Sequence, residues 1–238
     1  MKREAPADVF ARLLGDDFAC EERRSFDGPM LAHPLEIESV GRAVAKRRRE
    51  FLTGRTCARL ALRRLGLEAG PLLAAPSRAP QWPAGAVGSI THTEGYCAAA
   101  VASSGRIASV GIDAQAIDAV SAPLWRLLFG PAEMALLDAE AARHRPELAA
   151  LLFAAKEAFF KCQHPLTGRM LSFQAVTIRP TPAGFAVCGP PVEALGPRPL
   201  DGRWAAANGT AFAAVWASAS GARGSPPAQV AQPIAAGA

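Results

Sequence analysis

The chain shows the same order of secondary-structure patterns twice: helical residues, then a β-hairpin. This order constrains the fold more than any single motif does. In the first pass, apolar residues recur at helical spacing over 36–66, and Gly66 follows as a C-terminal cap. Proline, glycine and serine then indicate a loop over 70–88. The apolar runs 96–102 and 106–113, separated by a serine-serine-glycine turn, predict a hairpin.

The second pass begins with Pro131, at the favoured first position of a helix, and Pro146 begins another helix that extends to about Gln163. Strand patterns follow over 173–188 and 203–217, and an asparagine-glycine pair in the latter indicates a hairpin turn. The two passes predict an α+β fold made of two similar halves that meet near residues 105–115.

We place these halves at residues 1–110 and 111–220. Residues 221–238 consist mainly of glycine, proline, alanine, serine and glutamine, and we expect a disordered tail there. Half of the 238 residues are hydrophobic, which is enough for a core in each half.

Composition indicates a protein of the reducing cytoplasm. The five cysteines are widely spaced, odd in number and without a C-x-x-C pair, which argues against a disulfide framework or a zinc site. The N-terminus lacks the apolar core of a signal peptide. The longest uncharged apolar run, 148–155, is far shorter than a membrane span, so we expect no membrane insertion.

The arginine-rich segment KRRREFLTGR at 46–55 is the first candidate for function. Arg48, Arg55 and Arg59 fall on roughly one helical face, with Arg47 beside them. Such a face can bind phosphates through guanidinium groups, or a nucleic-acid backbone. A solvated surface is the alternative for any charge run.

The segment VGIDAQ at 110–115 is the second candidate. Asp113 and Gln115 stand two residues apart, so they share one face of a predicted strand. Oxygen side chains that project together suit a hard cation such as Mg²⁺. A turn-capping aspartate and a solvated glutamine are the alternative.

The segment FAAKEAFFK at 153–161 is the third candidate. Glu157 and Lys161 lie one turn apart on a helix that is apolar on most other sides. A functional carboxylate with a nearby cation explains this pattern. The alternative is an ordinary helical ion pair worth about 0.3–0.5 kcal/mol.

The segments RAPQWP at 78–83 and GSITHT at 88–93 are the fourth candidate. An arginine, a stiff proline and tryptophan segment and a cluster of serine, threonine and histidine can frame an anion site. Ser89 and His92 also suggest a hydrolase, but no G-x-S-x-G motif surrounds Ser89.

Taken in order, these four motifs closely resemble the 4′-phosphopantetheinyl transferase superfamily over about residues 40–180, and the enterobactin-synthetase type in particular. That type serves siderophore, nonribosomal peptide and polyketide synthesis. The resemblance implies a pseudo-dimer of two α+β halves with the active site in the cleft between them. It also implies transfer of the phosphopantetheine arm of coenzyme A to a carrier-protein serine, with 3′,5′-ADP as the other product.

The resemblance implies a role for each candidate residue. Asp113 and Glu157 would hold Mg²⁺ against the pyrophosphate of coenzyme A, and Lys161 would stabilise the leaving charge. Glu157 would also accept the proton of the carrier serine. The residues expected to bind coenzyme A are Arg47, Arg55, Arg78, Ser89, Thr91, His92, Asp113 and Lys161.

Gln115 departs from the family pattern G-I-D-x-E, in which an acid occupies its position. Its amide oxygen can still bind Mg²⁺, so we expect weaker metal binding rather than lost activity. A homologue that binds coenzyme A without catalysis is one alternative, and a basic nucleic-acid-binding protein is another. We expect no nucleic-acid partner, because only Phe51 accompanies the arginines for stacking on bases. The expected partner is an acidic acyl or peptidyl carrier domain, and the internal pseudo-dimer favours a monomer.

Overall fold

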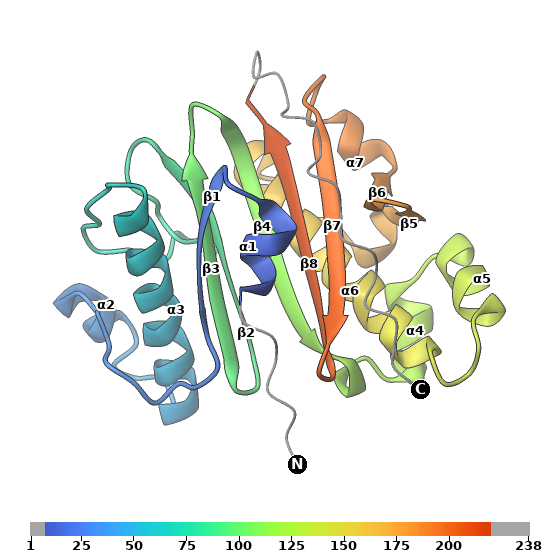
Figure 1. Ribbon diagram of the computed structural model, residues 1–238, viewed down its shortest axis with the longest axis horizontal. Helices are drawn as coiled ribbons and strands as arrows, with labels where there is room; N and C mark the ends of the chain where they lie inside the picture. The colour runs from blue at the N-terminus through green and yellow to red at the C-terminus, as the bar shows by residue number, and fades with distance from the viewer. Residues whose placement is uncertain (1–7, 220–238) are drawn as a thin grey trace.

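The structure contains the same succession of elements twice, in each case a strand, a long helix and a β-hairpin (Figure 1). It is a computed structural model that describes residues 8–219, so the tail expected over 221–238 lies outside the described residues. The helix α1 (Val9–Leu14) comes first. The first succession comprises β1 (Phe18–Arg23), α2 (Pro34–Ser39), α3 (Ala45–Arg64), β2 (Ala86–Thr93) and β3 (Tyr96–Ser103). The second comprises β4 (Ile107–Ala116), η1 (Ile117–Ala119), α4 (Ala122–Leu128), α5 (Pro131–Ala139), α6 (Arg145–Thr167), η2 (Phe173–Ala175), β5 (Thr177–Thr181), β6 (Gly184–Cys188), α7 (Pro190–Glu193), β7 (Leu200–Ala207) and β8 (Thr210–Ser218).

Both main sheets are antiparallel and have the same internal order. The first sheet has the order β1-β3-β2, and the second has the order β4-β8-β7. In each, the strand that precedes the long helix forms one edge, and the second strand of the hairpin lies in the middle. The strands β5 and β6 form a separate ribbon next to β7. This shared topology confirms the prediction of an α+β fold with two similar halves.

The hairpin predicted from residues 96–102 and 106–113 is wrong. β3 pairs with β2 through a tight turn at Gly95, whose φ is +70°, and it pairs with β1 on its other side. Both edges of β3 are therefore occupied, and β4 pairs along its length with β8 instead. An apolar run indicates a strand, but the tertiary packing decides its partner. The division of the chain at residues 110 and 111 stays a prediction, and β4 enters the second sheet from Ile107.

Most helix and turn signals in the sequence are confirmed. α5 begins at Pro131, and α6 begins one residue before Pro146. The helix expected over 36–66 is divided into α2 and α3, and Gly66 follows α3 with a φ of +72°. The turn between β7 and β8 contains Asn208-Gly209, both with positive φ, as predicted. No helix within the described part of the chain combines the length and apolar character needed to cross a bilayer.

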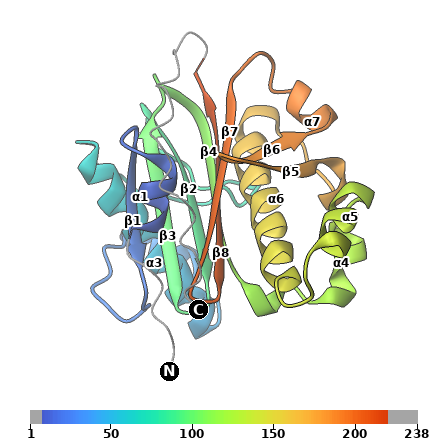
Figure 2. The same ribbon diagram turned by 45° about the vertical axis from the view of Figure 1, so that its right-hand side comes forward.

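Helices cover both faces of the two sheets. α3 packs on the first sheet and α6 on the second, whereas α1 lies on the opposite face and contacts both sheets (Figures 1 and 2). The ring of Phe10 in α1 lies 6.5 Å from that of Tyr96 in β3 and 5.8 Å from that of Phe212 in β8. α1 therefore helps to hold the two halves together on the face opposite α3 and α6.

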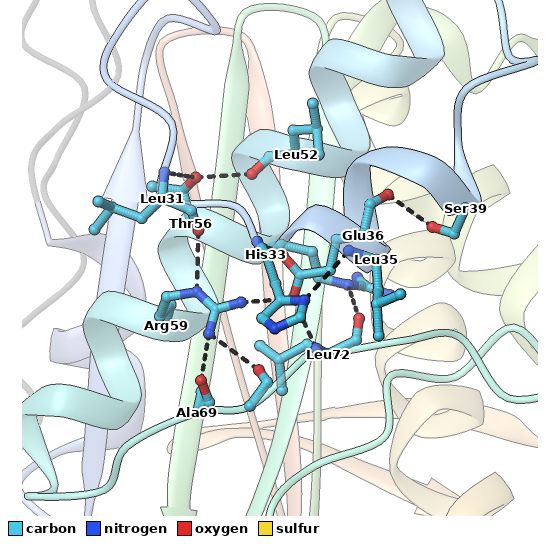
Figure 3. A network of polar contacts seen from close by, with 12 residues as sticks. Leu31, His33, Leu35, Glu36, Ser39, Leu52, Thr56, Arg59, Ala69 and Leu72 are labelled. Carbon is cyan, nitrogen blue, oxygen red and sulfur yellow. Dashed lines mark hydrogen bonds and ion pairs between the residues drawn. The ribbon is translucent and has the colours of Figure 1, made fainter.

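A buried ion pair connects α2 with α3 in the first half (Figure 3). The carboxylate of Glu36 is fully buried and lies 2.6 Å from the guanidinium of Arg59. It also accepts the backbone N–H groups of His33 at 2.8 Å and Leu72 at 2.7 Å. Arg59 also donates to the carbonyl oxygens of Leu31, Ala69 and Gly70. Because every polar group has a partner, the network fixes the loop that follows α3.

The second half contains the same arrangement. Glu133 is the third residue of α5, just as Glu36 is the third residue of α2, and both helices begin with proline. The buried carboxylate of Glu133 lies 2.8 Å from Nζ of Lys156 in α6, and it accepts the backbone N–H of Ile178. Lys156 donates to the carbonyl oxygens of Phe173 and Val176. Each half thus joins a first-turn glutamate to a cation of its long helix.

Candidate active site

The two halves meet where β2 of the first sheet lies beside β4 of the second, and we call this junction the seam. Within residues 8–219 no backbone ladder joins these strands. Instead, the N–H groups of Ile112 and Ala114 donate to the hydroxyls of Ser89 and Thr91, at 3.0 and 3.1 Å. Both hydroxyl-bearing residues are buried. Side chains of the first half therefore bind the backbone of the second half along the seam.

Asp113 lies on the face of β4 that packs against α6. Gly111, two residues earlier on this face, is so close to α6 that an added Cβ would lie 1.9 Å from the carbonyl oxygen of Ala158. Oδ1 of Asp113 lies 2.7 Å from Nζ of Lys161, which also donates to the carbonyl oxygen of Ile112 at 3.0 Å. The strand motif and the helix motif singled out in the sequence therefore come together here.

Glu157 lies one turn before Lys161 on α6 and is half-buried. Burial raises the pKa of its carboxyl above the usual value, the charge of Asp113 raises the pKa further, and Lys161 opposes both effects. A carboxylate with a raised pKa is a stronger proton acceptor than an ordinary glutamate. The position of Glu157 thus suits a general base.

The oxygen atoms around Asp113 fit a hard divalent cation. Asp113 and Gln115 share the face of β4 that is turned toward α6, and Glu157 is close enough for its carboxylate to be repelled by Asp113. A bound cation would relieve that repulsion. Carboxylate and amide oxygens are ligands that Mg²⁺ accepts. Among the described residues no three His, Cys, Asp or Glu side chains form a metal-binding group. The role of Gln115 as a ligand stays a prediction.

Arg47 and His92 face each other on the first-half side of the seam. Nη1 of Arg47 lies 3.1 Å from Nε2 of His92. Glu50, which no sequence motif indicated, lies 3.8 Å from Arg47 and 3.9 Å from His92. Only its position one turn after Arg47 hinted at this contact. Desolvation lowers the pKa of His92, Glu50 opposes this shift, and Arg47 lowers the pKa further. These effects together favour the neutral imidazole of His92 beside the guanidinium of Arg47.

Arg55 is buried next to this pair, whereas Arg78 is exposed on a loop. Nε of Arg55 donates to the carbonyl oxygen of Leu72 at 2.6 Å, and its guanidinium lies 4.2 Å from the ring centre of Phe51. Burial lowers the pKa of Arg55 to about 10, and Glu36 opposes the shift. Arg78 has a φ of +67° and, in the described range, its side chain makes no hydrogen bond or ion pair. The structure thus gives no side-chain bond between Arg78 and the other predicted residues.

The basic face expected of Arg48, Arg55 and Arg59 does not exist as one surface, and this interpretation is corrected. Arg48 is exposed, but Arg55 is buried and Arg59 is bound to the buried carboxylate of Glu36. Helical spacing shows which residues share a face, but the packing of neighbouring elements decides how much of that face reaches water.

A cavity of about 230 Å³ opens beside Glu157. Apolar side chains of α6 and the following loop form most of its lining, among them Phe159, Phe160, Met170, Leu171 and Phe173. No sequence signal indicated this cavity, because its walls come from segments whose contact depends on the fold. A larger cavity of about 780 Å³ lies around Trp125 and Arg145, and it contains none of the predicted site residues.

Comparisons with known proteins identify the family of this chain. Residues 35–102 match the 4′-phosphopantetheinyl transferase N-terminal domain, and residues 109–195 match the 4′-phosphopantetheinyl transferase superfamily. The 4′-phosphopantetheinyl transferase Svp of Streptomyces mobaraensis is 42% identical over 219 residues, which are 87% of this chain and 88% of that protein. The 4′-phosphopantetheinyl transferase PptT of Mycobacterium tuberculosis is 36% identical over 226 residues, which are 88% of this chain and 96% of that protein.

Solved structures give a looser match. A holo-(acyl-carrier-protein) synthase from Bacillus anthracis, in complex with CoA (3′,5′-ADP), is 20% identical with a TM-score of 0.40, and the match covers 48% of this chain and 99% of that one. The family models and the full-length relatives are decisive: the chain belongs to the 4′-phosphopantetheinyl transferase superfamily.

Proposed function

We propose that this chain transfers the phosphopantetheine arm of coenzyme A to a serine of an acyl or peptidyl carrier domain and releases 3′,5′-ADP. The observation that carries this proposal is the meeting of two unlike groups at the seam. Arg47 and His92 of the first half offer positive charge and hydrogen bonds, and Asp113, Glu157 and Lys161 of the second half form an acid-rich centre. A nucleotide anion and a reacting pyrophosphate need these two environments side by side.

Arg47, Arg55, Arg78 and His92 are our candidates for binding the 3′-phosphate and the adenylate. Nη1 of Arg47 and Nε2 of His92 lie 3.1 Å apart, so a phosphate group that binds beside this pair could be reached by both side chains. Arg55 adds a buried positive charge. Its bond to the carbonyl oxygen of Leu72 also holds the start of the loop that leads to Arg78. The resemblance places Ser89 and Thr91 here too, but we leave them out of the binding set because their hydroxyls are buried and bonded to β4.

Asp113, Gln115 and Glu157 would hold Mg²⁺, which when bound neutralises part of the charge on the pyrophosphate. Lys161 is held by Asp113 and by the carbonyl oxygen of Ile112, so its ammonium is fixed at the same place. We propose that this fixed charge faces the phosphate oxygen on which negative charge develops.

Glu157 is our candidate for the general base. In the transfer, the serine Oγ forms a bond to the β-phosphorus of coenzyme A, and the bond from that phosphorus to the bridging oxygen breaks. The bridging oxygen leaves with 3′,5′-ADP, and the serine proton passes to Glu157 directly or through a water molecule.

The apolar cavity beside Glu157 is our candidate for the pantetheine arm. It begins at the proposed base and is lined by Phe160, Met170 and Phe173. A flexible arm with an alkyl backbone gains from such a lining, and the arm would then extend from the reacting phosphorus into the cavity.

We further propose carriers of siderophore, nonribosomal peptide or polyketide synthesis as substrates, in line with the enterobactin-synthetase type. A monomer would suffice, since both sides of the proposed site come from one chain. A cytoplasmic location agrees with the five cysteines, none of which is in a disulfide.

Intact-mass spectrometry of apo carrier domains, incubated with the protein, coenzyme A and Mg²⁺, tests the function. We expect a mass gain of one phosphopantetheine arm, which EDTA and Glu157→Ala abolish. Glu147→Ala is the matched control, because Glu147 is an exposed carboxylate of the same helix outside the site. If no acyl, peptidyl or aryl carrier gains mass while coenzyme A still binds, the protein is a binding homologue, for which Gln115 is the one sequence sign.

A further inference from the structure

The hydroxyl of Thr91 donates one hydrogen bond and accepts another at the seam. Oγ1 accepts the backbone N–H of Ala114 at 3.1 Å, and it donates its proton to Oδ1 of Asp113, also at 3.1 Å. The residue is only 2% exposed, so water does not compete for either bond. One side chain of the first half thereby joins the backbone and the carboxylate of the second.

Asp113 is consequently held through one of its two carboxylate oxygens. Oδ1 receives the hydroxyl of Thr91 and the ammonium of Lys161, and Lys161 is itself fixed by the carbonyl oxygen of Ile112. Within residues 8–219, Oδ2 has no hydrogen-bond donor. Such a carboxylate has one anchored oxygen and one oxygen that remains available to a cation, which is the arrangement that partners of a metal ligand produce.

We infer that Thr91 is a positioning residue, which orients Asp113 for divalent-cation binding. The inference rests on the proposed function, because it assigns Asp113 to the metal site. It gives the first half of the chain a role in the metal centre, although the three proposed ligands all come from the second half.

Ser89 offers the matched comparison for this role. It lies two residues before Thr91 on β2, is 4% exposed and accepts the N–H of Ile112 at 3.0 Å. It therefore contributes the same kind of bond to the seam, but it makes no contact with Asp113. A role in holding the strands together would be common to both residues, whereas orientation of Asp113 belongs to Thr91 alone.

The test is direct binding of Mn²⁺, used as a paramagnetic substitute for Mg²⁺ and followed by electron paramagnetic resonance in the presence of coenzyme A. We expect Thr91→Val to weaken Mn²⁺ binding by about 10-fold or more, as removal of a metal ligand's hydrogen-bond partner commonly does. Ser89→Ala should keep Mn²⁺ affinity within about twofold, even where its melting temperature falls as much as that of Thr91→Val. Thr91→Ser, which retains the hydroxyl, should restore most of the affinity.

Equal Mn²⁺ affinities for Thr91→Val and Ser89→Ala would overturn the inference and leave Thr91 as a seam residue only. If Thr91→Val does not fold, Thr91→Ala and Thr91→Ser provide the same comparison, with and without the hydroxyl. Failure of the proposed function has a different signature, because the wild-type protein itself would then neither bind Mn²⁺ nor modify a carrier.

Discussion

Replacing Gly111 with alanine tests whether the contact between β4 and α6 creates the catalytic geometry. The added Cβ would lie 1.9 Å from the carbonyl oxygen of Ala158 and 2.6 Å from the backbone nitrogen of Cys162. Both atoms belong to the backbone of α6, so no side-chain rotation can relieve the overlap. The strand and the helix must therefore separate by about 1 Å before the contact becomes tolerable.

That separation acts on the site because Asp113 and Lys161 lie on the two elements that move apart. Their contact of 2.7 Å would lengthen, and Glu157 would move with Lys161. Misplacement of reacting groups by about 1 Å lowers rates by about 100-fold, and overpacking costs about 1–3 kcal/mol of stability. We therefore expect Gly111→Ala to remain folded at moderate temperature, with a lower melting point and about 100-fold slower carrier modification.

The assay is the initial rate of mass gain on an apo carrier, with the folded fraction measured by circular dichroism. Gly105→Ala is the control, because Gly105 lies in a turn where the nearest atom to an added Cβ is 3.7 Å away. It should retain the rate and melting temperature of the wild type. A Gly111→Ala protein with the wild-type rate and wild-type melting temperature would refute the reasoning.

Three further predictions concern the buried pair, the histidine and the glutamine. Lys156→Met should lower the free energy of unfolding by about 3–5 kcal/mol in urea titrations, because it leaves the carboxylate of Glu133 buried without its cation. The double variant with Glu133→Leu should recover part of this loss. Equal stability of Lys156→Met and the wild type would contradict the prediction. The pKa of His92 is lower in the folded chain than its ordinary value of 6.5, so below pH 6.5 the unfolded chain binds more protons and stability should fall as pH falls. Melting curves of His92→Gln should lack that component, and an unchanged pH profile would show that His92 does not cause it. Gln115→Glu adds a carboxylate to the proposed metal site and should lower the Mg²⁺ concentration needed for half-maximal rate; an unchanged Mg²⁺ dependence would remove Gln115 from the ligands.

The chemical centre of the second half was predictable because its residues are local. Asp113 and Gln115 are two residues apart, so they share a face of a strand. Glu157 and Lys161 are four residues apart, so they share a face of a helix. Each pair is therefore visible in a few consecutive residues. The meeting of the two pairs followed only from the family resemblance, since no local pattern places β4 against α6.

The first half was less predictable, because some of its polar residues are buried in the core and others are exposed at the site. Helical spacing grouped Arg59 with Arg48 and Arg55 on one face, and nothing in the arginine run shows that Glu36 would hold Arg59 inside. Ser89 and Thr91 were read as candidates for ligand contact, and only the position of β4 shows that their hydroxyls replace a backbone ladder. Which strands pair with one another depends on contacts between residues distant in the sequence. The prediction of a hairpin between β3 and β4 was wrong for the same reason.

The repeated buried pair allows the two long helices to be compared position by position. When α3 and α6 are aligned so that Arg59 matches Lys156, Arg64 matches Lys161. The match extends to the bonds: Arg64 binds the carboxylate of Glu21 and the preceding carbonyl oxygen in β1, just as Lys161 binds a carboxylate and the preceding carbonyl oxygen in β4.

The same comparison sets Leu60 of α3 against Glu157 of α6. The first half therefore has an equivalent ion pair between Arg64 and Glu21, but it has an apolar leucine at the position of the proposed base. The two helices thus differ at the position of the proposed base. Under the proposed function, the two copies of an equivalent scaffold would have different tasks: the first would hold a nucleotide and the second would accept a proton.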